Sequence, residues 1–438
     1  MRSALACAAL SLLLFPAQSS AAGPAAGPAD SALSPISGFL LTAKDDDVIL
    51  ARRADKDLGF DTYTGLPFIR DMEFRVRNDA FDLAGQRYGI RVEPRGFGES
   101  DASRRFNGAL VKQSGQRNRM LLNRALVERY FTVIDLLTKE EKQRLYQEMI
   151  SVTEDRILVL DKRKTGVNFD FNTLIEAEIE LSKLKAQNLD AMKEIKVLEL
   201  RIGQFMKGPF AGFDTAGFIP VEAIIPMAET GRFVVDTNHV YMDYLEMGLE
   251  LAESRYRMEK AKSRRFLSFL EFSYDVGGRL EEQARRDQGR DYDLGKAYIF
   301  EAGFRLPGLT DGDLDLNRRK DELLSEKEDF EQKKRELKNV MEKDIQDIFS
   351  LIAQYRYLRI RETEVDAKAS LKKYMQVSGV DPLILLSLKA SNLRNSIELE
   401  EVKSGLLFNY IKVMDATGEI SRPPLRNFLS ARNEVLAP

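Results

Sequence analysis

The chain has 438 residues, of which 31% are charged and 44% hydrophobic, and its formal net charge is −3. This composition is too charged for a helical membrane protein and too apolar for a disordered chain. The sequence contains no strongly basic stretch, which argues against nucleic acid as a partner.

The first 22 residues have the features of an export signal. Arg2 supplies the positive end, residues 4–15 form a short apolar core, and the small residues of Ser19–Ala22 fit a cleavage site. We therefore expect residues 1–22 to be a signal peptide and the mature chain to be exported; an uncleaved anchor is the alternative. Cys7, the only cysteine, lies within this leader, so no disulfide is expected.

A short helix is expected at about Gly38–Asp57, and the stretch after it alternates in polarity. From about residue 68 to 97, apolar and charged side chains take turns at every second position, which indicates β-strands. A turn near Asp79–Gly85 divides this stretch, so we predict a β-hairpin. Phe74 and Tyr88 fall on one face of it, and charged side chains fall on the other.

Two long helices are predicted after the hairpin. Leucine and other apolar residues recur at spacings of three and four in both, at about 101–164 and 171–206. A glycine-containing break separates them, and Gly208-Pro209 ends the second. Residues 210–235 then form a connector that contains several Gly and Pro residues.

The same order of elements then recurs. A helix at about 236–263 leads into a second alternating stretch, 266–306, which predicts another hairpin. Two more helices are expected at about 314–374 and 383–416. In the first of them, Leu and Phe recur every seven residues, which is the coiled-coil repeat.

This recurrence predicts a tandem duplication. Residues 23–209 form the first repeat and 236–418 the second, and each reads as a short helix, a β-hairpin, a long helix, a tip and a return helix. The predicted fold is therefore mainly α with a small β part. The remaining tail, 419–438, contains Pro423-Pro424 and is expected to be loosely ordered.

The alternating strands are about ten residues long, the length that a tilted strand needs to cross a bilayer. An apolar face opposite a charged face is typical of a transmembrane barrel, and a soluble sheet packed on a helix is the alternative. Four strands cannot close a barrel, so we expect several copies to share one. A charged lumen needs room for water, which favours three copies and twelve strands.

Three sets of residues follow from this interpretation. The predicted lumen-lining residues are Arg75, Arg77, Arg87, Arg91, Arg95, Glu271, Glu301 and Arg305. The predicted lipid-facing residues are Phe74, Tyr88, Phe272, Tyr274, Tyr298, Phe300 and Phe304. The predicted tips of the helical hairpins contain Gly166, Asn168, Gly379, Asp381 and Pro382.

This order of elements resembles that of the TolC-type outer-membrane efflux proteins, of which the chain is identified as a divergent member. The resemblance rests on Leu66-Pro67 before the first hairpin, Gly303–Pro307 and Asp311-Gly312 after the second, and Gly379–Leu386 at a tip. It covers about Leu40–Gly418, and its specific part is the order and spacing of the elements, found twice.

The resemblance implies a homotrimer in the cell outer membrane. Twelve strands would form the barrel and twelve helices a periplasmic tunnel, with the helical tips at its inner end. It would be a passive conduit, working with a periplasmic adaptor (membrane fusion protein) and an inner-membrane transporter in tripartite efflux or type I secretion. Many family members narrow the inner end with a ring of aspartates; here Leu383–Leu388 contains no acid, and Asp381 is the nearest one.

No combination of residues typical of catalysis or metal binding is found in the sequence. His239, the only histidine, has no ligand cluster around it, and Asp45–Asp47 fit a solvated helix face. Asp311–Asp315 lacks the spacing of a calcium loop. We therefore expect no enzyme activity, cofactor or metal. The alternatives to a duct are a periplasmic adaptor-like protein and a secreted coiled-coil scaffold without a pore.

Overall fold

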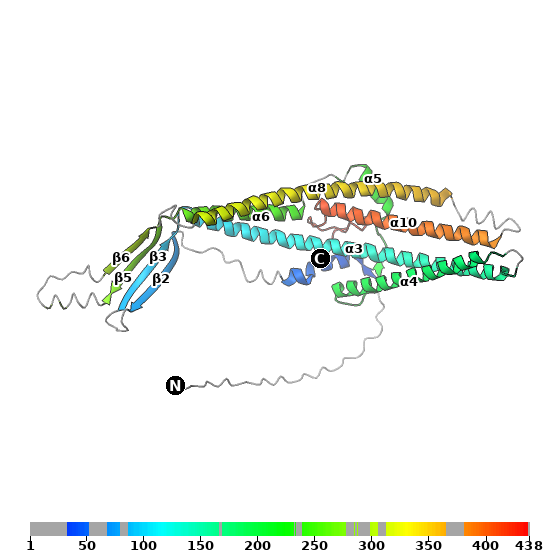
Figure 1. Ribbon diagram of the computed structural model, residues 1–438, viewed down its shortest axis with the longest axis horizontal. Helices are drawn as coiled ribbons and strands as arrows, with labels where there is room; N and C mark the ends of the chain where they lie inside the picture. The colour runs from blue at the N-terminus through cyan, green and yellow to red at the C-terminus, as the bar shows by residue number, and fades with distance from the viewer. Residues whose placement is uncertain are drawn as a thin grey trace, which may run out of the picture.

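The computed structural model describes residues 33–51, 68–78, 86–165, 169–231, 233, 239–276, 284, 287, 298–304, 312–364 and 381–436. These residues form an elongated molecule in which a four-stranded sheet lies at one end of a layer of long helices (Figure 1). The fold is mainly helical with a small β part, as the sequence predicts. None of the helices in these ranges is long and apolar enough to cross a bilayer.

Four long helices make up most of the layer. Helix α3 has 65 residues and is about 98 Å long at 1.5 Å per residue. It lies between α4 and α10, and α10 in turn contacts α8, so the order across the layer is α4, α3, α10, α8. The bounds of these helices are Glu99–Arg163 for α3, Phe171–Met206 for α4, Gly312–Glu364 for α8 and Pro382–Ala416 for α10.

Local sequence explains where these helices begin and end. The carboxylate of Asp170 accepts a hydrogen bond from the backbone N–H of Asn172 and caps the start of α4. Lys207, with φ at 54°, adopts the left-handed conformation that ends this helix. Asp381 caps α10 in the same way through the N–H of Leu383, and Pro382 occupies the first helical position, where its missing N–H costs nothing.

Helix α6, Val240–Ser263, completes the layer beside the sheet, where it lies between α3 and α8. Figure 1 shows α10 and α6 following one another along the molecule. At their meeting point, Nε2 of His239 lies 3.5 Å from Oδ1 of Asp415. Nδ1 of His239 accepts a hydrogen bond from the N–H of Tyr241 and so caps α6. His239 therefore has a packing and capping role.

The first repeat differs from expectation before its hairpin. In place of one helix at Gly38–Asp57, the chain forms a short α1, Ile36–Leu41, and a 3-10 helix, η1, Thr42–Asp45. A further helical turn follows at 47–51, and the rest of the expected helix lies outside the described residues. Asp46 is extended, with ψ at 133°, and its carboxylate accepts a hydrogen bond from the N–H of Val48. This aspartate interrupts the helix by capping the next turn.

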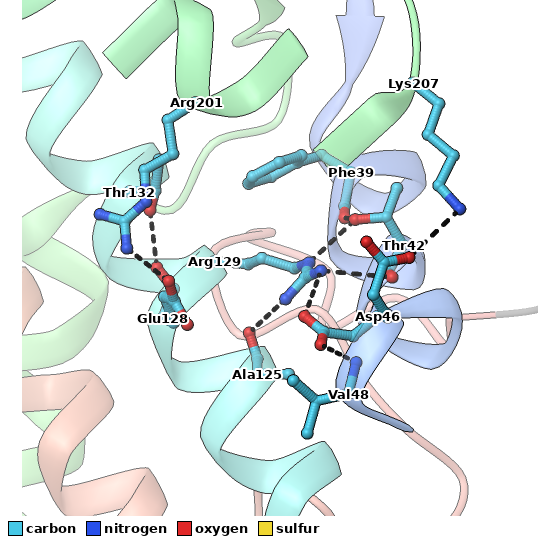
Figure 2. Close-up of polar contacts among 11 residues, drawn as sticks. Phe39, Thr42, Asp46, Val48, Ala125, Glu128, Arg129, Thr132, Arg201 and Lys207 are labelled. Atoms are coloured by element: carbon cyan, nitrogen blue, oxygen red, sulfur yellow. Dashed lines mark hydrogen bonds and ion pairs between the residues drawn. The ribbon is translucent and has the colours of Figure 1, made fainter. Parts of the chain in front are cut away.

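Arg129 on α3 holds this segment in place. Its guanidinium is buried, 1% exposed, and donates hydrogen bonds to Oγ1 of Thr42, at 2.9 Å, and to the carbonyl of Ala125, at 3.0 Å. The same group lies 3.2 Å from Oδ2 of Asp46 and faces the ring of Phe205. Figure 2 shows these contacts converging on Arg129. Burial lowers the pKa of Arg129, and the Asp46 carboxylate opposes that effect.

The main hydrophobic core lies at the middle of the molecule, where α1, α3, α4, α8 and α10 meet the connector and the tail. The connector contains a two-residue strand, β4, Phe213-Asp214, which pairs with β1, Ser34-Pro35. It also contains α5, Val221–Glu229, whose Ile224 is fully buried. The core therefore brings together helices from both halves of the chain.

The tail is packed into this core, so the expectation of a loosely ordered tail is wrong. Ile420 is 1% exposed and Leu429 is fully buried. The carbonyl of Leu429 accepts a hydrogen bond from the N–H of Ile219 at 2.8 Å. The hydroxyl of Tyr130 donates to the carbonyl of Arg426 at 2.6 Å. Burial of the tail's apolar residues outweighs the effect of its two prolines.

Candidate functional site: the sheet, the tips and the open edges

The sheet joins the two halves of the chain. Its strands are all antiparallel and follow the order β2, β3, β5, β6. The two predicted hairpins therefore pair with each other through β3 and β5. Within the described residues, β2 and β6 each have a neighbour on one side only. The strands are β2, Ile69–Asn78; β3, Gln86–Pro94; β5, Leu267–Asp275; and β6, Tyr298–Phe304.

One face of the sheet is apolar, and its side chains form rows across all four strands. The register places Phe74, Ile90, Phe272 and Phe300 in one row. The next row consists of Val76, Tyr88, Tyr274 and Tyr298. Phe74 is 69% exposed and Phe300 67%, so none of the residues that the structure describes covers the face. All seven predicted lipid-facing residues are among the described ones, and Phe304 lies opposite Leu267 at the end near the helices.

The opposite face carries the charges. Glu73, Arg91, Glu271 and Glu301 form one row across the strands. Glu271 is only 2% exposed, and its carboxylate lies 3.5 Å from Arg75 and 3.8 Å from Arg77. The predicted arginines are therefore balanced by acids rather than forming a purely positive surface.

The other predicted lumen-lining residues have different settings. Arg87 lies 3.4 Å from Asp275 across the β3–β5 pair. Arg95 lies just beyond β3, where its Nε donates to the carbonyl of Ile69 at 2.8 Å. Glu301 is exposed, and Arg305 lies outside the described residues.

Two glycines shape the charged face. A Cβ at Gly303 would overlap the ring of Phe269, and one at Gly89 would lie 3.0 Å from the Cβ of Ser273. The Phe269 ring covers Gly303 and also lies 3.9 Å from the guanidinium of Arg91. This aromatic side chain lies on the charged face because Phe269 is two residues from Glu271 on the same strand, in the same register.

The tips of the two helical hairpins are joined by an ion pair. Nη1 and Nη2 of Arg163, at the end of α3, lie 2.9 and 2.7 Å from Oδ2 and Oδ1 of Asp381, before α10. The Arg163 hydrogen bond, with the N–H of Leu383, lowers the pKa of Asp381. The structure thus gives Asp381 a partner that the sequence did not indicate. Gly166, Asn168 and Gly379 lie outside the described residues.

The helical layer, like the sheet, has open edges. Its outer helices α4 and α8 expose large apolar side chains along their length. On α4 these are Ile175, Ile179, Leu189, Val197 and Leu200. On α8 they are Leu324, Val340, Phe349, Tyr357 and Ile360. Exposed apolar surface on this scale indicates a partner surface.

Other polar groups have structural settings. Asp46 of the Asp45–Asp47 run contacts Arg129, and Asp47 lies 3.7 Å from Lys207. Among the residues that the structure describes, no group of three or more His, Cys, Asp or Glu side chains is arranged to hold a metal ion.

Comparison with solved structures identifies the fold. The open-state MtrE outer-membrane channel of Neisseria gonorrhoeae is 13% identical, with a TM-score of 0.57 over 88% of this chain and 89% of that one. The CmeC outer-membrane channel of Campylobacter jejuni is 12% identical, with a TM-score of 0.55 over 87% and 84%. The outer-membrane protein VceC of Vibrio cholerae is 13% identical, with a TM-score of 0.54 over 87% and 96%.

These structures share the arrangement of helices and strands with this chain over almost their whole length. No protein-family model matches the sequence, and no curated protein matches it. The fold is nevertheless that of the TolC-type outer-membrane channels, as the order of sequence elements predicts.

Proposed function

We propose that this protein is the outer-membrane exit duct of a tripartite efflux or type I secretion system. It would act as a passive conduit for substrates delivered by an inner-membrane transporter through a periplasmic adaptor. The observation that carries the proposal is the sheet, which has an exposed aromatic face, a charged face and two open edges. An apolar face suits lipid, and a charged face suits a water-filled lumen.

The open edges support an oligomer. Unpaired backbone groups at β2 and β6 would be costly in hydrocarbon, so neighbouring copies must supply their partners. Four strands per chain give twelve in a trimer, which is wide enough for a lumen with water. The exposed apolar residues of α4 and α8 support the same closure, because each copy's α4 would meet the next copy's α8.

The helices would extend the duct into the periplasm. Helix α3 alone is about 98 Å long, and its outer end carries the hairpin tip near Arg163. We place the contact with adaptor and transporter at these tips, in line with the expectation from sequence. An N-terminal export signal fits this location in the outer membrane.

The alternatives account less well for the sheet. An adaptor-like protein or a secreted coiled-coil scaffold would keep its strands in water. Phe74 and Phe300 would then remain exposed along with the rest of their row. Large exposed apolar patches are unusual in soluble monomers.

Cysteine cross-linking tests whether β2 of one copy pairs with β6 of the next copy. The only native cysteine is Cys7, in the predicted leader, so any disulfide in the rest of the chain must form between introduced cysteines. A Met72→Cys/Ala302→Cys variant, and neighbouring combinations along β2 and β6, should give a cross-linked ladder that stops at the trimer. As a control, Val92→Cys/Leu270→Cys joins directly paired residues of β3 and β5, and should cross-link within one chain.

Planar-bilayer recording tests the pore. Purified protein should produce discrete channel events, and the cross-linked trimer should retain them. A detergent-independent monomer with no events would overturn the proposal and favour the scaffold.

A further inference from the structure

A shallow groove lies where the helices meet the sheet. It has a volume of about 370 Å³ and is formed by the first turns of α3 and the last turns of α6. We call it the junction groove and define it by Phe97, Asp101, Arg105, Arg257, Lys260 and Arg264. Gly96, just before it, packs so closely on α6 that a Cβ there would lie 2.6 Å from the carbonyl of Ala261. The groove is thus fixed to the base of the sheet.

The groove is strongly basic. Four cations and one acid, Asp101, line it, and all four cations are exposed. Arg257 is paired with Glu253 at 2.6 Å. Arg105, Lys260 and Arg264 have no carboxylate within ion-pair distance among the residues that the structure describes. The ammonium of Lys260 lies 5.9 Å from the centre of the Tyr256 ring. Three positive charges are therefore available to an external anion.

An apolar side chain stands beside these charges. Phe97 is 96% exposed, although phenylalanine is normally buried. Phe68 is 81% exposed, and Phe304 is 61% exposed. Register pairs Ile69 with Pro94, and Phe304 with Leu267, so these rings lie at the end of the sheet that faces the helices.

We propose that the junction groove binds the phosphate of an anionic phospholipid while Phe97 inserts among the adjoining acyl chains. This inference rests on the proposed function, in which the sheet spans the outer membrane and the helices lie in the periplasm. The groove then lies at the level of the inner-leaflet headgroups. Aromatic side chains prefer this depth, and basic side chains attract anionic lipid there. The groove would fix the depth of the sheet in the membrane.

The test measures lipids retained by the full-length protein. Protein purified in detergent is equilibrated with a mixture of phosphatidylglycerol and phosphatidylcholine, and bound lipids are counted by native mass spectrometry. Wild type should prefer phosphatidylglycerol. Arg105→Gln/Lys260→Gln/Arg264→Gln should lower that preference by about tenfold, because each basic group near an anionic surface adds to its attraction.

Two further variants separate local binding from bulk charge. Lys183→Gln/Lys193→Gln/Lys334→Gln removes three exposed charges from the tunnel helices, none of which has an ion-pair partner in the described part of the chain, and should keep the wild-type preference. Arg105→Lys/Arg264→Lys keeps the positive charge of the groove and should also keep the wild-type preference for phosphatidylglycerol. Equal preferences in wild type and the groove variant, or an equal loss in both triple variants, would overturn the inference.

A Phe97→Ala variant tests the aromatic part. It should retain fewer lipids of both kinds, with the phosphatidylglycerol preference unchanged. If Phe97→Ala retains as many lipids as wild type, Phe97 does not take part in lipid binding. Flotation of wild type with vesicles of the same lipids distinguishes the two levels of failure. If the protein does not insert at all, the proposed function fails; if it inserts without a lipid preference, only the junction groove fails.

Discussion

Nη2 of Arg129 and Oδ2 of Asp46 lie 3.2 Å apart, although 83 positions separate them in sequence. The contact fastens the segment before the first hairpin to the middle of α3. Because the guanidinium is 1% exposed, the Asp46 carboxylate compensates its charge, and Thr42 accepts one of its hydrogen bonds.

Replacing this arginine should destabilise the protein. We expect Arg129→Ala to lower the free energy of unfolding by about 3–5 kcal/mol, because it leaves a cavity and takes the partner from Asp46. The measurement is urea denaturation in detergent, followed by helical circular dichroism. Arg124, five residues earlier on α3, is exposed and serves as the control; Arg124→Ala should change stability by less than about 0.5 kcal/mol. Similar midpoints for both variants would contradict the role of Arg129.

The tail should loosen when its hydrogen bond to α3 is removed. Tyr130→Phe deletes the bond to the carbonyl of Arg426 and should cost about 0.5–1.5 kcal/mol. We expect limited proteolysis to cleave within the tail faster than in wild type. Tyr357→Phe is the matched control, since Tyr357 is 65% exposed. Identical cleavage rates for all three proteins would rule out this anchoring role.

The link between the hairpin tips should depend on pH. The Arg163 hydrogen bond lowers the pKa of Asp381 in the folded protein. The Arg163–Asp381 contact therefore stabilises the tips fully when the pH is above the ordinary aspartate pKa of about 3.9. The effect is lost as the pH falls through the lower, folded value. We therefore expect spin labels on the two tips to move apart only below about pH 4.

Asp381→Asn should separate the tips already at neutral pH. The matched control is Asp161→Asn, because the Asp161–Lys164 pair lies at the end of α3, within one hairpin rather than between the two. Tips that stay together in Asp381→Asn at every pH would show that other contacts hold them.

The buried acid of the sheet should influence ion selectivity. Glu271→Gln removes the carboxylate that faces Arg75 and Arg77, and losing a charged contact of this kind costs about 1.5–3 kcal/mol. Arg75 keeps its 2.6 Å contact with Glu73, but the charged face loses one negative charge, so the reversal potential of the channel should shift toward that of chloride. Glu301→Gln is the control for loss of an exposed charge in the same row. Equal shifts for the two variants would show that burial of Glu271 has no special effect.

Much of the fold follows from local patterns in the sequence. Helix α4 covers Phe171–Met206, the predicted range, because an Asp cap, a regular apolar stripe and a Gly-Pro stop all lie close together in sequence. The strict period of two likewise indicates the strands. Local patterns determine such elements because the period of side chains differs between helix and strand.

Contacts between segments far apart in the sequence could not be predicted from these local patterns. The pairing of β3 with β5, the irregular register near Phe269 and the Arg163–Asp381 link each join residues far apart in sequence. The tail was misjudged because its prolines are visible locally, whereas the pocket that receives Leu429 is built by other segments.

The column made by α10 and α6 contains a joint, because α10 ends at Ala416 and α6 starts at Val240. Helices α3 and α8 contact both members of the column and pass the joint without a break. The continuous helices α3 and α8 therefore brace the junction between α10 and α6. A force along the column must cross the noncovalent contact between Asp415 and His239, whereas α3 carries it past the joint within one continuous helix.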